Sequence, residues 1–161
     1  TGVMIEAAPR FWRVLAESYT FTPGPEAAAV RPKAANEFTV GALNALFLLE
    51  EEENIEVKYQ KIARYIDEQM GLPDILAMQE VGAFTELNNL AFYLEQQNPQ
   101  AQYDAYLLPT NLDLKLGYLV REHFTNIQIS QLGAEEIFTF SGGLLHDRPP
   151  LLLQVELPTD P

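Results

Sequence analysis

The chain has 161 residues, of which 47% are hydrophobic, and its 23 acidic and 10 basic residues give a net charge of −13. The length and apolar content suffice for one compact domain with a sizeable core. The acidic balance argues against broad gripping of nucleic acid, which needs clustered Lys and Arg, but allows a hydrolase that contacts phosphates locally through a cation. The chain has no Cys, which excludes disulfides and thiolate metal sites, and no apolar run long enough to predict a membrane span.

Residues 1–36 differ in pattern from the rest of the chain. Four prolines interrupt this segment, at positions 9, 23, 25 and 32. Because proline removes a backbone donor and fixes φ, we expect no regular element here, but a Pro-rich extension or linker that precedes a domain over 37–161. The apolar side chains around Trp12 predict that part of this extension packs on another surface.

From Phe38 onward the pattern becomes regular. Side chains 59, 62, 63, 66 and 70 form an apolar stripe with helical spacing, and Gly71 and Pro73 follow as stop signals. The acidic run Glu50–Glu53 indicates a solvated loop or a frayed helix. The elements expected in chain order are a strand over 38–43, a helix over 58–70, a strand over 74–81 and a helix over 84–97.

The remaining residues are typical of strands. Short apolar segments separated by turn residues predict strands over 103–108, 116–120, 127–132, 137–140 and 151–157. The β-α-β-α order predicts parallel first strands joined by a right-handed crossover, followed by antiparallel strands. The expected fold class is therefore α/β (α+β), with a mixed β-sheet flanked by helices.

Polar side chains follow two of the apolar strands. Asn44 comes after the first strand, and Gln79-Glu80 ends the second. If these strands are parallel neighbours, Asn44 and Glu80 lie at the same edge of the sheet, where ligand sites occur in open α/β sheets. A partly desolvated carboxylate among oxygen ligands suits Mg²⁺ or Mn²⁺. From spacing alone, a solvent-exposed Glu and a turn-starting Asn remain open as the alternative.

Four segments, in the correct order, resemble the endonuclease/exonuclease/phosphatase (DNase I-like) superfamily. The segment 73–81, PDILAMQEV, resembles that family's "pDIl-a-lQEv" strand, and 40–46, VGALNAL, is similar to its first strand, which ends in Asn. Downstream, 116–121, LGYLVR, resembles the "giailyr" strand, and 148–151, RPPL, resembles the "RpPL" before the next strand. The resemblance spans residues 38–157.

The resemblance implies a metal-dependent phosphodiester hydrolase, nuclease-like, whose fold is a four-layer α/β/β/α sandwich. Glu80 would then ligate the catalytic Mg²⁺ or Mn²⁺ with Asn44 in support, and Lys115 and Arg148 would contact the substrate phosphate. For Arg148, a turn contact with Asp147 is the alternative. The implied substrates are nucleic acids, nucleotides or phospholipid head groups. Bacterial extracellular relatives slightly favour a secreted or cell-surface location.

The later motifs of that family, "GDfN" and "SDH", do not occur in this sequence. Neither His123 nor His146 follows Ser-Asp, so both are predicted to be non-catalytic. We therefore expect an N-terminal half of the sandwich that binds its cation weakly and is inactive or nearly so. The alternative is a non-catalytic interaction module of the same fold, which would self-associate or bind a complementary C-terminal half.

Overall fold

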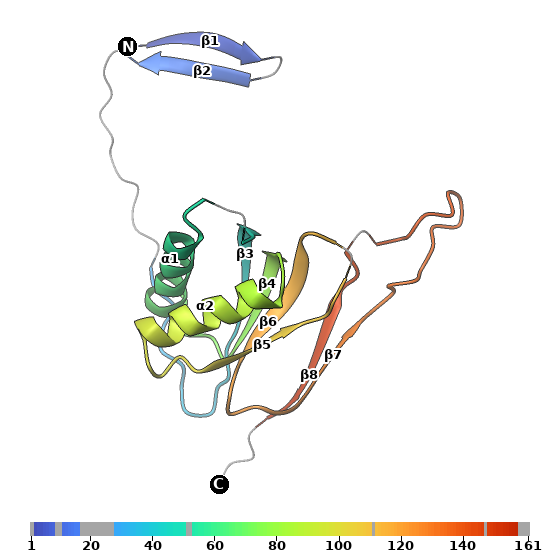
Figure 1. Cartoon of the computed structure of the whole chain (residues 1–161). Coiled ribbons are helices and arrows are strands. Elements are labelled where there is room, and N and C mark those ends of the chain that lie inside the picture. The colour runs from blue at the N-terminus through green and yellow to red at the C-terminus, as the bar shows by residue number, and fades with distance from the viewer. Residues whose placement is uncertain are drawn as a thin grey trace.

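The computed structural model describes residues 28–50, 53–110, 112–146 and 148–157, and the backbone of two strands within 2–8 and 11–16 (Figure 1). The elements in chain order are β1 (Gly2–Ala8), β2 (Phe11–Ala16), β3 (Val40–Leu48), α1 (Ile55–Glu68), β4 (Ile75–Val81), α2 (Phe84–Gln97), β5 (Tyr103–Leu107), β6 (Lys115–Arg121), β7 (Thr125–Gln131) and β8 (Leu151–Glu156). The mixed α and β content confirms the expected fold class. Among the described helices, none combines the length and apolarity that crossing a membrane requires.

The central element is a four-stranded mixed sheet with the order β3-β4-β6-β5. Strand β3 runs parallel to β4, whereas β6 runs antiparallel to both β4 and β5. Helix α1 connects β3 to β4, which confirms the expected β-α-β unit. Because β3 and β4 are parallel, their carboxyl ends lie at one edge of the sheet.

Both helices cover one face of this sheet (Figure 1). On α1 the buried side chains Tyr59, Ala63 and Ile66 recur at helical spacing and face the core. Tyr59 stacks on Tyr93 of α2 with ring centroids 5.3 Å apart, which joins the two helices. The fully buried side chains of this core include Leu48, Ile66, Leu76, Met78, Leu87, Leu90, Leu94 and Leu119.

A two-stranded ribbon, β7 paired antiparallel with β8, packs on the opposite side of the sheet from the helices. Alternate residues of β8 turn inward, so that Leu153 and Val155 pack against buried Ile75, Val120 and Phe124. The described residues of the main body therefore form three layers: helices, sheet and ribbon. One half of a four-layer sandwich stays a prediction.

Two sequence expectations about regular elements were wrong. Strands β1 and β2 form an antiparallel hairpin within the Pro-rich extension, where no regular element was expected. Of the four prolines only Pro9 lies near these strands in sequence, and it falls between them, so both strands stay proline-free. The side chain of Trp12, predicted to pack on another surface, lies outside the described residues. The strand expected over 137–140 is reduced to a single bridge between Ile137 and Leu144.

Candidate functional site

Asn44 and Glu80 meet at the carboxyl edge of β3 and β4. Asn44 pairs with Gln79 in the strand register, and its Nδ2 donates to Glu80 Oε1 at 2.9 Å. The proximity expected from parallel strands is thus confirmed. Asn44 is exposed and Glu80 is partly buried, so both side chains are accessible from solvent.

The end of β3 wraps around the Glu80 carboxylate. The backbone N–H of Phe47 donates to Glu80 Oε2 at 3.3 Å, and that of Leu46 donates to Asn44 Oδ1 at 2.8 Å. Each carboxylate oxygen of Glu80 therefore receives one described hydrogen bond and keeps a lone pair for a further ligand. This leaves Glu80 oriented but still able to bind a cation.

The backbone around this contact is unusual in three residues. Leu46, Phe47 and Glu80 have φ angles of 50°, 58° and 60°, in the left-handed region that side chains other than Gly rarely adopt. The β3–β4 register shifts between Asn44 and Leu48, and the β4–β6 register shifts between Met78 and Val81. Strained residues and β-bulges both concentrate at functional sites, and here they surround one Asn–Glu pair.

Gly82 closes the junction behind Glu80. Its N–H donates to Leu48 O at 2.8 Å, and a Cβ added at this position would lie 2.7 Å from Leu49 Cδ2 and 3.0 Å from Leu48 O. Any larger residue would push the end of β3 away from β4. The glycine therefore keeps the two strand ends close enough for Asn44 to reach Glu80.

Lys58, near the start of α1, is a site residue that sequence reasoning missed. Its Nζ donates to the carbonyl oxygens of Leu46 and Phe47, the latter at 2.7 Å. It thereby fixes the left-handed turn whose N–H groups hold Asn44 and Glu80. The sequence carries no signal for this role, because it depends on β3 continuing past Asn44 and curling toward the helix.

The two predicted phosphate contacts differ in their placement. Lys115 pairs with Val81 across the β4–β6 ladder and donates from Nζ to Gly82 O at 2.5 Å, so its ammonium lies at the same edge as Glu80. Arg148 is exposed and lies two residues before Pro150, which lines a hollow of about 230 Å³ together with Gln79. Asp147, the alternative partner of Arg148, lies outside the described residues.

Oxygen ligands for a hard cation are present, but few. Within the described ranges, no three His, Asp or Glu side chains come together as a metal cluster. Glu80 with Asn44 fits Mg²⁺ or Mn²⁺ by ligand type, and water would fill most coordination positions. Weak binding of Mg²⁺ or Mn²⁺ stays a prediction.

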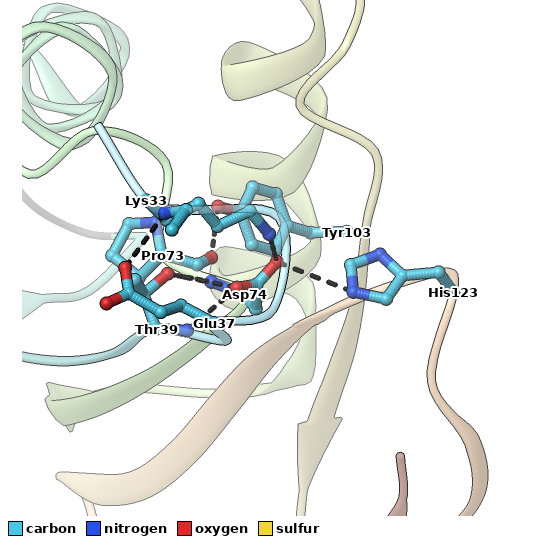
Figure 2. Close-up of polar contacts among 8 residues, drawn as sticks. Lys33, Glu37, Thr39, Pro73, Asp74, Tyr103 and His123 are labelled. Carbon is cyan, nitrogen blue, oxygen red and sulfur yellow. Dashed lines mark hydrogen bonds and ion pairs between the residues drawn. The ribbon is translucent and has the colours of Figure 1, made fainter. Parts of the chain in front are cut away.

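A second polar cluster lies at the opposite end of β4 (Figure 2). Asp74 is 1% exposed, and it accepts hydrogen bonds from Lys33 Nζ at 2.5 Å and from Thr39 N and Oγ1 at 2.8 and 3.0 Å. His123 Nε2 lies 3.4 Å from the same carboxylate. These contacts tie the segment before β3 to the sheet, so the cluster acts as a structural anchor.

Burial and hydrogen bonding oppose each other at Asp74. Burial raises the pKa of its carboxyl, but the hydrogen bonds from Lys33 and Thr39 outweigh it and hold the pKa below its ordinary value.

Burial lowers the pKa of His123, the negative charge of Asp74 raises it, and the positive charge of Lys33 lowers it further, so that the pKa lies below its ordinary value. His123 thus sits in a local contact of the anchor, and His146 lies 4.0 Å from Glu136 on another part of the chain. Neither histidine contacts Glu80, although their expected non-catalytic character stays a prediction.

Comparisons of this chain with protein-family models, with curated proteins and with solved structures found no match.

Proposed function

We propose that the Asn44–Glu80 edge is the cation-binding part of a metal-dependent phosphodiester hydrolase. The observation that carries the proposal is the Asn44–Glu80 hydrogen bond, held among three residues in left-handed backbone conformation. Such strain persists only where surrounding contacts enforce it, and here the strained turn directs the Phe47 N–H to the Glu80 carboxylate and the Leu46 N–H to Asn44 Oδ1. The resemblance of the two strands to a phosphodiesterase superfamily points to the same residues.

In this proposal each residue has a separate task. Glu80 and Asn44 would hold Mg²⁺ or Mn²⁺, which when bound would polarise a phosphoryl oxygen of the substrate. The N–H of Phe47 and the amide of Asn44 orient the Glu80 carboxylate. Lys115, at the same edge, can offer its ammonium to a phosphate oxygen in exchange for the Gly82 carbonyl.

Binding of a phosphodiester at the proposed cation site can be tested with a paramagnetic cation. Dimethyl phosphate with Mn²⁺ and the protein should show added broadening of its ³¹P resonance, and the Glu80→Gln variant should lose it. Glu95→Gln, an exposed carboxylate on α2, serves as the matched control and should behave like the unchanged chain. Equal broadening with Glu80→Gln would remove the basis of the proposal.

Turnover itself is expected to be at or near background. One carboxylate leaves most of the cation's coordination to water, and such a cation is weakly held and poorly positioned. Bis(4-nitrophenyl) phosphate and DNA are suitable substrates for this test. Clear hydrolysis that Glu80→Ala abolishes would contradict the expected inactivity while supporting the site.

A second function is favoured by one observation, the uncovered side of β3. Val40 is 64% exposed, and the described apolar residues packed against the β7–β8 ribbon come from β4, β5, β6 and the segment after β6, not from β3. Val40 and Phe38, which is 53% exposed just before β3, are apolar side chains open to a partner, and they suit an interaction module that binds a complementary chain or a second copy. Sedimentation of the chain over a range of concentrations distinguishes a monomer from a self-associating species, and a Val40→Lys variant should abolish the association.

A further inference from the structure

Residues 132–146 form an apolar projection between β7 and β8. Figure 1 shows this segment extending away from the body of the protein as a long loop with two arms. Its exposed large side chains are Leu132, Ile137, Phe138, Phe140, Leu144 and Leu145. Phe140, near the tip, is 94% exposed, so the hydrophobic effect strongly favours its transfer out of water.

The projection has a defined shape. Phe138 N–H donates to Gly143 O and Leu145 N–H donates to Glu136 O, each at 2.7 Å, which ties the two arms together as in a hairpin. The rings of Phe138 and Phe140 lie 6.0 Å apart. Gly142 turns the tip with a φ of 70°. The apolar side chains are therefore presented together, and an apolar phase can accept them without first ordering the loop.

Shape and charge restrict what can cover these side chains. A convex tip needs a concave partner or a deformable apolar phase. The segment contains no Lys or Arg, Glu135 and Glu136 are exposed on it, and the whole chain carries a net charge of −13. Anionic lipid surfaces would repel it, and a second copy would bring two such charges together. A zwitterionic lipid surface meets the shape requirement without this repulsion.

The projection leaves the body at the edge that carries Glu80. Leu151, the first residue of β8, pairs with Gln131 and lines a hollow with Met78 and Gln79, the residues just before Glu80. A surface that accepts the tip would therefore face the carboxyl edge of β4. For a lipid bilayer, that surface is an array of phosphodiester head groups.

We propose that residues 132–146 insert into the interface of a zwitterionic phospholipid bilayer and place the Glu80 edge against the head groups. The choice of lipid as the occupant rests on the proposed phosphodiester function. The binding itself depends on Phe140 and its apolar neighbours, and it requires neither a cation nor turnover.

Flotation of the full chain with phosphatidylcholine vesicles tests the proposal. The unchanged chain should float with the vesicles, and a Phe140→Ser/Leu144→Ser variant should lose about tenfold or more of its partitioning. Phe92→Ser, which removes a 53% exposed aromatic from α2, is the matched control and should float normally. Circular dichroism should show that each variant is folded, because the altered side chains are all more than half exposed.

Four outcomes would overturn the proposal. The first three are absence of flotation of the unchanged chain, equal flotation of the double variant, and a dimer, seen in sedimentation, that Phe140→Ser/Leu144→Ser abolishes. Vesicles of phosphatidylglycerol should bind more weakly than phosphatidylcholine, and stronger binding to them would also contradict it. The Glu80→Gln variant should float like the unchanged chain. A failure of the flotation test therefore leaves the cation proposal standing, and Mn²⁺ broadening that Glu80→Gln does not change removes the cation proposal without altering the flotation result.

Discussion

Replacing Leu46 by Gly measures the strain that surrounds the candidate site. Leu46 has a φ of 50° and a side chain that is 66% exposed, so the substitution removes little packing. A left-handed conformation costs a residue other than Gly about 1–2 kcal/mol, and Gly adopts it freely. Val40 lies in the same strand, is 64% exposed, and is not among the described residues with positive φ, which makes Val40→Gly the matched control.

The two variants share most of their energetic costs, so the difference in their free energies of unfolding isolates the backbone strain at Leu46. Both lose about 0.5–1 kcal/mol through the greater backbone freedom of Gly in the unfolded chain. Both also lose about 0.7 kcal/mol from the buried third of an aliphatic side chain. Only Leu46→Gly also relieves the backbone strain, so its free energy of unfolding should exceed that of Val40→Gly by about 1–2 kcal/mol. The stability of Leu46→Gly should therefore be close to that of the unchanged chain.

Urea unfolding of the three proteins at neutral pH, monitored by far-UV circular dichroism, gives these differences in the free energy of unfolding directly. A Leu46→Gly variant that loses as much stability as Val40→Gly would refute the reasoning, since no strain would then be stored at the end of β3. The function proposal would lose its backbone argument with it.

Three further outcomes are expected. The folded-state pKa of Asp74 lies below its ordinary value, so the Asp74 carboxylate stabilises the fold at neutral pH, and this contribution is lost as pH falls below about 4. Asp74→Asn should therefore be less stable than the unchanged chain at pH 7. Its urea midpoint should also lack this part of the dependence on acid pH. Tyr118→Phe removes the hydroxyl that donates to Leu151 O at 2.7 Å, so it should lower the free energy of unfolding by about 1 kcal/mol and speed amide hydrogen exchange in β8. Unchanged exchange in β8 would show that this hydrogen bond does not hold the ribbon on the sheet. Lys58→Met removes the donor to the Leu46 and Phe47 carbonyls and should weaken Mn²⁺ binding several-fold, whereas Lys58→Arg should weaken it less. A Mn²⁺ titration that Lys58→Met does not alter would exclude Lys58 as a positioning residue.

The part of the site that depends on strand order was predictable from the sequence. A helical stripe between two apolar runs requires a crossover, and a crossover makes the runs parallel. Parallel strands end at one edge, so Asn44 and Glu80 had to approach each other if the strands were neighbours. Lys115 reached the same edge for a related reason, because the antiparallel partner of β4 begins where β4 ends.

The support around the pair was not predictable. The expected first strand ended at Leu43, and nothing in the side chains of Leu46 and Phe47 favours the positive φ that they adopt. That curl is imposed by tertiary contacts, namely the Lys58 ammonium on its carbonyls and Glu80 on its N–H. Pattern reasoning works on residues near in sequence, whereas these contacts join three separate elements.

The apolar projection shows the same limit from the other side. The run from Ile137 to Phe140 has the composition of a buried strand, and the sequence expectation treated it as one. In the structure the segment finds no sheet partner beyond one bridge and leaves its side chains exposed. Composition reports that a side chain prefers an apolar environment, but it does not report whether the same chain provides one.

The central claim is that Asn44 and Glu80 form a cation site, and paramagnetic mapping with Mn²⁺ tests it most directly. Amide resonances of the ¹⁵N-labelled chain should broaden first at Leu46, Phe47 and Val81, the residues that border the Glu80 carboxylate, and Glu80→Gln should abolish this selectivity. Broadening centred on another acidic segment, or an unchanged pattern in Glu80→Gln, would contradict the account.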